Sequence, residues 1–385
     1  MSDTKVKFKE TEIGLIFEDR EFLKVKDVAD INSRTINKQY EHAEIEYLDT
    51  SSTDNGQILE WQKLSLEEAP SRAKRILRKN DIVISTVRPN LKHFAILDKV
   101  NDNSVGSTGY ALTTATKCNP KFLYYQLTTD EVTEYLSRIA DSSVSTYPSI
   151  RPEIIANLEL SFPDIEEQQK IAEVLGALDE RIELNRKMNK TLESIGQAIF
   201  NHMFCHSELD SESSEMTLGD IAEITSGKRP EEKSSTMTGE FKIPLVGASS
   251  VMGYVKKPLY GEEIIITGRV GTHGILQRIN YPCWPSDNTL VIKSQFPNYI
   301  YYVMKTFDFN SLNRGSTQPL ITQTDLKNYS IGTLDRSTIR VFEEITSVLN
   351  SKVNTNNKEM ENLSQTRDSL MPRLMSGKLR ISDVQ

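Results

Sequence analysis

Residues 165–204 read IEEQQKIAEVLGALDERIELNRKMNKTLESIGQAIFNHMF, and this stretch decides the fold. Counting four and then three residues forward from Ile171 selects mostly apolar positions, and this alternation is the seam of a coiled coil. Asp164, followed by Glu167 three residues later, forms a capping-box pattern at the start. We therefore expect one long helix from near residue 166 to residue 204. Its seam comprises Ile171, Leu175, Leu178, Ile182, Asn185, Asn189, Leu192, Gly196, Ile199 and Met203.

The same spacing returns near the C-terminus and predicts a second helix from near residue 337 to residue 375, ending before Gly377. The two seams keep a constant offset of 171 positions. One such helix cannot bury its seam alone, but two can bury each other's seams, so we expect an antiparallel pair that acts as a spacer. The second seam comprises Phe342, Thr346, Leu349, Val353, Asn356, Met360, Leu363, Arg367, Leu370 and Leu374.

Asn185 and Asn356 occupy equivalent seam positions, each near the middle of its helix. Because midpoints meet in an antiparallel pair, we expect the two asparagines to approach each other near a pseudo-twofold axis. A polar pair in such a seam fixes the register at some cost in stability. The alternative is that both side chains face solvent.

The chain upstream of each helix is also duplicated, and the matching segments occur in the same order. A fixed order with stable spacing is a stronger signal than any single match, and coincidental strand-rich segments are the alternative. The matching pairs are LKVKDVADINS (23–33) with MTLGDIAEITS (216–226), NDIVISTVRPN (80–90) with EEIIITGRVGT (262–272), NPKFLYYQL (119–127) with FPNYIYYVM (296–304), and SVSTYPSIRPEIIANLEL (143–160) with GSTQPLITQTDLKNYSIG (315–332).

These patterns predict an α+β protein with two similar strand-rich domains, separated by two long antiparallel helices. Short apolar runs such as DIVISTV and EIIITGRV indicate strands. The acidic, Ser-rich stretch 206–216 is typical of an exposed linker. The expected segments are 1–163 (first domain), 164–205 (central helix), 206–335 (linker and second domain) and 336–385 (C-terminal helix and tail).

Composition excludes several classes of protein. The hydrophobic content of 37% supports packed cores, and no apolar run is long enough for a membrane span or a signal peptide. The three cysteines, Cys118, Cys205 and Cys283, are far apart, so we expect no disulfide framework and a cytoplasmic location. The net charge of −8 argues against indiscriminate coating of nucleic acid, but allows basic side chains to be segregated in one cleft.

Catalytic motifs are absent from the sequence. There is no GxxxxGK[ST] phosphate loop, GRVGTHG (268–274) lacks the GxGxxG spacing, and no Asn/Asp-Pro-Pro-aromatic segment occurs. PDIEEQQK (163–170) could suggest a nuclease carboxylate cluster, but acidic residues in a first helical turn are expected from the helix dipole. His202, Cys205 and His206 are close in sequence but lack a clear fourth metal ligand. We therefore expect no metal and no cofactor in this chain.

Three segments resemble a known family. FKETEIGLIFEDREFLKVKDVADI (8–31), the helix 165–204 and TRDSLMPRLMSGKLRI (366–381) are similar to the N-terminal entry, the central helix and the C-terminus of Type I restriction-modification specificity subunits. The order of domains and helices matches as well. One departure is Arg20, where many relatives carry a tryptophan, and it concerns packing more than function.

The resemblance implies a non-catalytic subunit that reads double-stranded DNA through two target-recognition domains. It implies two methylase subunits, which would supply S-adenosylmethionine, and two motor-nuclease subunits, which would use ATP and Mg. No membrane partner is implied. Each domain would read one half of a bipartite, gapped site.

Candidate DNA contacts are Arg, Lys, Asn, Gln, Ser, Thr, Tyr and His side chains on loops that recur in both halves, because such groups read base edges or fix phosphates. Solvated turns are the alternative for each. Tyr124, Tyr125, Tyr301 and Tyr302 follow helical spacing, which favours a core position over base stacking. The candidates are Arg34, Lys38, Arg88, Asn90, Lys92, His93, Ser145, Thr146, Tyr147 and Arg151 in the first half, and Lys228, Arg229, Arg269, Thr272, His273, Arg314, Ser316, Thr317 and Gln318 in the second.

Two rival functions remain open at this point. A self-sufficient DNA methyltransferase would bind S-adenosylmethionine without a partner. A coiled-coil adaptor would bind proteins at its globular ends and would not discriminate between DNA sequences.

Overall fold

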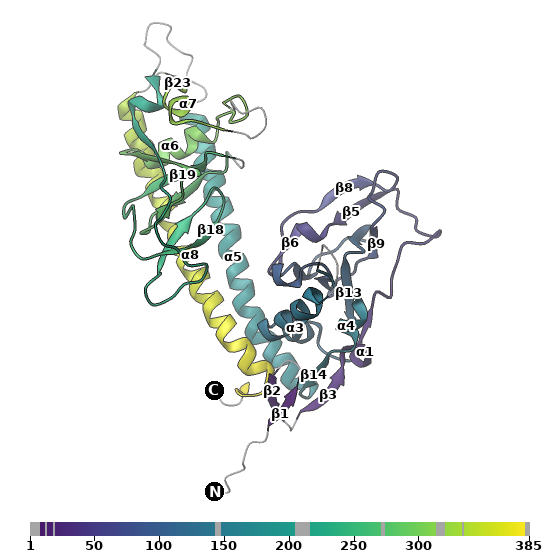
Figure 1. Ribbon diagram of the computed structural model, residues 1–385. Coiled ribbons are helices and arrows are strands. Elements are labelled where there is room, and N and C mark those ends of the chain that lie inside the picture. Colours follow the sequence, from purple (N-terminus) through teal and green to yellow (C-terminus); the bar gives the residue numbers. More distant parts are fainter. Residues whose placement is uncertain are drawn as a thin grey trace. The chain divides into compact units, whose positions relative to one another are not determined.

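The computed structural model describes residues 8–11, 14–17, 20–142, 148–204, 216–270, 274–312, 320–332 and 335–381 (Figure 1). Its internal contacts divide the chain into two compact units. Unit 1 comprises Met1–Glu183 together with Glu359–Gln385, and unit 2 comprises Leu184–Lys358. Each unit therefore contains one strand-rich domain and a part of both long helices.

The two long helices have the predicted bounds, with α5 at Ile165–Phe204 and α8 at Arg336–Met375. The Asp164 side chain accepts a hydrogen bond from the Glu167 backbone N–H at 2.8 Å, which is the expected N-terminal cap. Gly377 follows α8 with a φ of 77°, a conformation that favours glycine and ends the helix.

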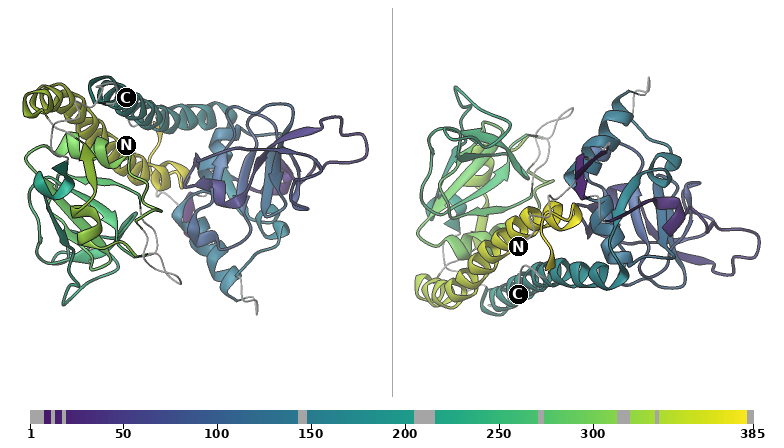
Figure 2. Two further views of the ribbon diagram at one scale, coloured as in Figure 1. Left: turned by 90° about the horizontal axis from the view of Figure 1, so that it is seen from above. Right: turned by 90° about the horizontal axis from the view of Figure 1, so that it is seen from below.

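The helices pack in antiparallel fashion within each unit (Figures 1 and 2). In unit 1, Asp179 of α5 pairs with Arg367 of α8 at 2.7 Å, and Arg181 pairs with Glu359, also at 2.7 Å. Moving forward along α5 therefore means moving backward along α8. All twenty predicted seam residues are buried or partly buried, which confirms the seam.

Asn185 and Asn356 are both buried in unit 2, with 1% and 0% of their surface exposed, so neither faces solvent. The Asn356 Nδ2 donates to the Oδ1 of Asn189, the next seam residue after Asn185, at 2.8 Å. Asn185 Nδ2 and Asn356 Oδ1 are buried without a hydrogen-bond partner. The direct approach of Asn185 to Asn356 stays a prediction.

Unit 1 contains two four-stranded sheets. The first has the order β11-β10-β13-β4 and is antiparallel throughout, and the second has the order β8-β5-β12-β9, with β5 and β12 parallel. The first sheet comprises β4 (Ala29–Ile31), β10 (Ile82–Ser85), β11 (Phe94–Ile96) and β13 (Tyr110–Ala115). The second comprises β5 (Glu44–Leu48), β8 (Gln62–Ser65), β9 (Ala73–Ile76) and β12 (Ser104–Ser107).

Unit 2 repeats this plan. Its first sheet has the order β16-β22-β19-β20 and is also antiparallel, and its second sheet has the order β18-β17-β21, with β17 and β21 parallel. The first sheet comprises β16 (Ala222–Ser226), β19 (Ile264–Gly268), β20 (Gln277–Ile279) and β22 (Thr289–Ser294). The second comprises β17 (Ile243–Val246), β18 (Val251–Val255) and β21 (Trp284–Pro285). The matching strand orders and the shared parallel pair of the second sheets confirm that the two domains are duplicates.

Several of the remaining elements also correspond. Those of unit 1 are β1 (Phe8–Thr11), β2 (Gly14–Phe17), β3 (Glu21–Lys24), α1 (Val25–Val28), η1 (Thr50–Ser52), β6 (Thr53–Asp54), β7 (Gln57–Ile58), η2 (Pro89–Leu91), α2 (Pro120–Leu127), α3 (Asp130–Asp141), α4 (Pro152–Ala156) and β14 (Glu159–Phe162). Those of unit 2 are β15 (Met216–Thr217), η3 (Leu218–Asp220), α6 (Pro297–Met304), α7 (Gln323–Lys327) and β23 (Ser330–Gly332). In the described residues, unit 2 has no counterpart of β1, β2, α3 or the β6–β7 pair, and an isolated antiparallel bridge between Tyr260 and Cys283 takes the place of β9.

Helices α2 and α6 carry the tyrosine pairs into the core. Tyr124, Tyr125 and Tyr302 are buried, and Tyr301 is partly buried, which confirms the core position expected from helical spacing. Unit 2 gathers Phe200, Phe204, Tyr299, Tyr302 and Phe342 into one aromatic cluster with ring centroids 4.9 to 6.4 Å apart. This cluster fixes α6 against α5 and α8.

Arg20 has a packing role in unit 1. Its buried guanidinium donates to the carbonyl oxygens of Leu374 and Met375 at 3.0 and 2.7 Å, and pairs with Glu167 at 2.6 Å. It therefore satisfies two backbone acceptors at the end of α8 and joins them to the first turn of α5. Across the described ranges, no helix combines the length and apolar character that a membrane crossing requires.

Candidate nucleic-acid interface

The predicted loop 86–93 of unit 1 follows β10 and contains the short helix η2. Arg88 and Lys92 flank η2, and both have left-handed backbone conformations, with φ values of 47° and 54°. Left-handed geometry is unfavourable for such side chains and persists only where the surroundings enforce it. The loop is therefore held in a specific conformation that exposes Arg88 and Asn90.

The second predicted loop of unit 1 lies directly beside the first. Val87 and Ser149 form an antiparallel bridge, the Arg88 N–H donates to the Pro148 carbonyl at 2.9 Å, and the Ile150 N–H donates to Thr86 at 2.8 Å. The two loops, separated by more than fifty residues in sequence, thus form one edge. Arg151 is exposed where α4 begins. Ser145, Thr146 and Tyr147 lie outside the described residues.

Three further contacts hold the first loop in place. Lys92 pairs with Asp130 at the start of α3 at 2.6 Å, and His93 Nδ1 hydrogen-bonds to the Thr53 carbonyl. The Asn55 N–H donates to the Lys92 carbonyl at 2.9 Å. The loop is therefore supported by α3 and by the β6–β7 hairpin.

Sequence reasoning missed both of these supports. The hairpin turn is Asp54-Asn55-Gly56, and an Asn-Gly pair between strands is a recognised turn signal that could have revealed it. Gly56 has a φ of 87°, and a Cβ added there would lie 2.5 Å from the Tyr124 hydroxyl. The position therefore requires glycine.

Arg34 and Lys38 are not brought to this edge. Arg34 forms an ion pair with the fully buried Asp81 and donates to Thr114 Oγ1 at 3.1 Å. Lys38 is exposed in a turn after β4. A buried carboxylate needs a paired cation, so this geometry favours a structural role for Arg34.

Unit 2 builds an equivalent edge. Val270 and Leu320 form an antiparallel bridge, and the Ile321 N–H donates to the Arg269 carbonyl at 2.9 Å. This is the counterpart of the Val87–Ser149 bridge. The remaining candidates on these two loops lie outside the described residues: Thr272, His273, Arg314, Ser316, Thr317 and Gln318.

The basic turn Gly227-Lys228-Arg229 adjoins the same edge. The Gly227 N–H donates to Thr289 and the Arg269 N–H to Asn288, so both segments meet the start of β22. The Lys228 N–H donates to the Pro285 carbonyl at 3.0 Å. Because these amides already have partners, a phosphate would be contacted by the exposed Lys228 and Arg229 side chains rather than by a backbone cradle.

Other chemistry finds little support in the described residues. No group of three His, Cys, Asp or Glu side chains there could hold a metal ion. His202 is exposed near the end of α5, while Cys205 and His206 lie outside the described residues. Burial raises the pKa of the Cys118 thiol to about 12 and that of Cys283 to about 11, so both stay protonated and unreactive near neutral pH.

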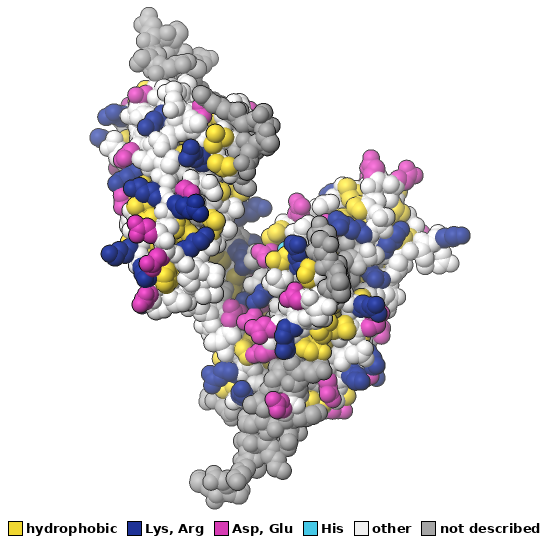
Figure 3. Space-filling view, viewed as in Figure 1, with side chains coloured by type: hydrophobic (Ala, Val, Ile, Leu, Met, Phe, Trp, Pro, Cys, Tyr) yellow, Lys and Arg dark blue, Asp and Glu magenta, His cyan; other side chains and the backbone are white. Residues whose placement is uncertain are grey.

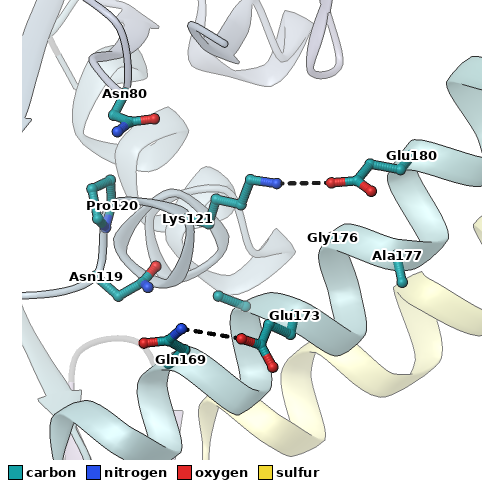
Figure 4. A pocket seen from close by; sticks show the side chains of 10 residues that line it. Asn80, Asn119, Pro120, Lys121, Gln169, Glu173, Gly176, Ala177 and Glu180 are labelled. Carbon is teal, nitrogen blue, oxygen red and sulfur yellow. Dashed lines mark hydrogen bonds and ion pairs between the residues drawn. The ribbon is translucent and has the colours of Figure 1, made fainter.

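A hollow of about 350 Å³ lies in unit 1 between α2 and α5, away from the loops (Figure 4). Lys121 pairs with Glu180 across it at 3.1 Å, and Gln169 donates to Glu173 at 3.1 Å. Small residues on α5, including Gly176 and Ala177, form its floor. Of its three charged groups, Lys121 and Glu180 neutralise each other, and Glu173 accepts from the neutral Gln169 amide.

Comparison with known proteins gives one consistent result. The family model described as "Type I restriction modification DNA specificity domain" matches residues 18–194 and 210–333. The chain is 32% identical over 214 residues to the Type I restriction enzyme HindI specificity subunit of Haemophilus influenzae, a match that spans 52% of this chain and 47% of that protein. It is 26% identical over 429 residues to the MjaIX specificity subunit of Methanocaldococcus jannaschii, spanning 99% of this chain and 98% of the relative.

A solved structure shares the fold. The Type-I restriction-modification system S subunit from M. genitalium superposes with a TM-score of 0.56 at 18% sequence identity. The superposition covers 97% of this chain and 98% of that one.

Proposed function

The chain belongs to the type I restriction-modification DNA specificity family, and we propose that it is a non-catalytic subunit that reads a bipartite DNA site. Each domain reads one half of the site, while the long helices serve as spacer and docking scaffold. The observation that carries this proposal is the repeated loop edge. Two loops, far apart in sequence, meet through a Val87–Ser149 bridge in one unit and a Val270–Leu320 bridge in the other.

The composition of these edges suits base recognition. Direct readout needs Arg, Asn, Gln, Ser or Thr side chains held on a rigid support, with cations fixing the phosphates. The candidates on these loops are of these types, and among the described ones the Arg88 N–H donates to Pro148 and the Arg269 N–H to Asn288. Lys92 already pairs with Asp130, so DNA phosphates compete with a carboxylate there. We therefore expect modest affinity for the isolated chain and a strong dependence on salt.

Exposed apolar side chains on the helices support docking of methylase subunits. Val174 of α5 and Ile345 of α8 occupy equivalent positions of the duplicated helices, and their exposed fractions are 38% and 44%. Val341 and Val348 extend this stripe on α8 at helical spacing. The α5 positions equivalent to Val341 and Val348 are Lys170 and Ala177, so the two helices share one exposed apolar position and α8 carries the longer stripe. We assign S-adenosylmethionine, ATP and Mg to the methylase and motor-nuclease subunits of the complex.

The decisive test is co-expression with the neighbouring methylase gene, followed by methylation sequencing of the host DNA. A single gapped motif that requires both genes supports the proposal and reveals both half-sites. If the chain forms a stable complex with the methylase but no new methylation appears, the result favours the alternative of a coiled-coil protein adaptor. Calorimetry on the lone chain addresses the methyltransferase alternative, because binding of S-adenosylmethionine without a partner would contradict a non-catalytic role.

A further inference from the structure

Residues 71–80 of unit 1 read SRAKRILRKN and form a second concentration of positive charge. The five cations Arg72, Lys74, Arg75, Arg78 and Lys79 fall within eight positions with no acidic residue between them, and we refer to them as the β9 basic patch. Arg72 directly precedes β9, Lys74 and Arg75 lie on it, and Arg78 and Lys79 follow it. Several Lys and Arg side chains line the margin of unit 1 where β9 lies (Figures 1 and 3).

Most of this charge has no counter-charge among the described residues. Arg72 pairs with Asp49 at 2.9 Å. Lys74, Arg78 and Lys79 are exposed, and none of them forms an ion pair within the part of the chain that the structure describes. Arg75 donates to Thr35 Oγ1 at 3.3 Å, while its Nε is buried without a partner. In a chain of net charge −8, so many unneutralised like charges repel one another and cost stability.

Protection of a sheet edge does not explain the patch. Lysines on an edge strand often prevent unwanted pairing with another chain. Here the outer edge of β9 is already covered, because the Ile36 N–H donates to the Lys74 carbonyl at 2.8 Å and Thr35 bridges to Arg75. The inner edge pairs with β12, with Ile76 opposite Val105. The charges therefore serve another purpose, and they stand on a strand that is fixed on both sides.

The patch begins beside the loop edge of unit 1. The Thr108 N–H donates to the Arg72 carbonyl at 2.7 Å, and the carbonyl of the next residue, Gly109, accepts from the Thr86 N–H at 2.8 Å. From there β9 runs away from loop 86–93. An extended strand advances about 3.3 Å per residue, so the patch continues away from the loop edge along β9.

We propose that the β9 basic patch binds the phosphate backbone of duplex DNA outside the bases that unit 1 reads. This inference rests on the proposed DNA-reading function and adds to it a contact surface that is independent of sequence. In unit 2 the equivalent of β9 is an isolated antiparallel bridge between Tyr260 and Cys283, and Lys256, at the position of Lys74, is paired with Glu232 and Glu240. Unit 1 therefore contributes more to the salt-dependent part of the affinity than unit 2 does.

The test compares two triple charge reversals in the full chain, bound to its methylase subunit. The patch variant is Lys74→Glu, Arg78→Glu, Lys79→Glu. The control is Lys63→Glu, Lys99→Glu, Lys117→Glu, which changes the same net charge at three exposed lysines of unit 1 outside the patch. Fluorescence anisotropy measures binding to one duplex that carries the motif and one that lacks it, across a series of salt concentrations. Thermal unfolding verifies that both variants fold.

If three phosphate contacts are lost, the slope of log K against log salt decreases in magnitude by about 2 to 3, since each contact contributes about 0.9. The patch variant should lose affinity equally for both duplexes and keep its preference for the motif, while the control keeps the wild-type slope. A patch variant whose slope matches the control overturns the inference. Loss of the methylase subunit with an unchanged slope also overturns it, by assigning the patch to a protein partner. Failure of the wild type to prefer the motif would instead count against the proposed function.

Discussion

Arg20 and Gly196 illustrate how single residues adapt the duplicated plan. The Arg20 guanidinium is only 7% exposed and serves two backbone carbonyls at the end of α8 and one carboxylate of α5. Gly196 is the counterpart of Arg367 at the offset of 171. In unit 1, Arg367 pairs with Asp179, which accepts a hydrogen bond from Tyr125 at 2.7 Å. In unit 2, the equivalent Tyr302 instead packs against the bare backbone of Gly196.

We predict that Arg20→Ala destabilises unit 1 by about 2 to 4 kcal/mol, because it leaves buried acceptors without a donor and removes the partner of Glu167. Arg373→Ala provides the control, since Arg373 is an exposed arginine of the same region of α8. Chemical unfolding followed by circular dichroism measures both. If both variants lose the same small amount of unfolding free energy, Arg20 does not stabilise the helix ends.

Two glycines of α5 should respond to alanine in opposite ways. A Cβ at Gly196 would lie 1.9 Å from the Tyr302 hydroxyl oxygen, whereas the nearest atom at Gly176 is the flexible end of Lys121 at 3.5 Å. We predict that Gly196→Ala destabilises unit 2 by about 1 to 3 kcal/mol through overpacking. Gly176→Ala should gain up to about 1 kcal/mol from helix propensity. Thermal unfolding distinguishes the two variants. Similar unfolding midpoints for Gly196→Ala and Gly176→Ala would show that Tyr302 does not pack closely on Gly196.

At the scale of elements, the long helices were the most predictable part of the molecule. Their seams and caps are local patterns, so the helix ends agree within about one residue with the predicted ones. The duplication was also visible, because order and spacing survive divergence. The structural role of Arg34 could not be predicted from the sequence. Its partner Asp81 is 47 positions away, and only the folded sheet brings the two residues together. The supports from α3 and the β6–β7 hairpin depend on similar long-range contacts.

The buried asparagines of the helix pair should cost stability. Asn185 Nδ2 and Asn356 Oδ1 are both buried without a partner, and an unpaired amide in a core is unfavourable. We predict that the double variant Asn185→Leu, Asn356→Leu raises the free energy of unfolding by about 1 to 3 kcal/mol. Leu349→Ala on the same seam is a control that should lower it. If the double variant is instead less stable than the wild type, the buried amide groups of Asn185 and Asn356 have hydrogen-bond partners in the folded protein.

At the scale of the whole molecule, the apolar stripe of α8 should matter for assembly rather than for folding. Val341, Ile345 and Val348 are 44 to 69% exposed, so replacing all three with serine removes little of the protein's own core. We predict an unchanged unfolding midpoint but loss of most of the bound methylase subunit, measured by co-purification and light scattering. Replacement of Met237, Val251 and Met252, exposed apolar residues of the second domain, is the control and should leave assembly intact. Full retention of the methylase after the α8 change would place its docking site elsewhere.

The central claim is that each unit reads its own half of one DNA site. The most direct test is methylation sequencing of cells that express the methylase gene with either Arg88→Ala or Arg269→Ala in this chain. These residues stand on the equivalent loops of units 1 and 2. We predict that each variant relaxes or abolishes recognition in one half of the motif, a different half for each variant, and leaves the other half and the gap unchanged. A variant that alters both halves together, or both variants altering the same half, would contradict the account.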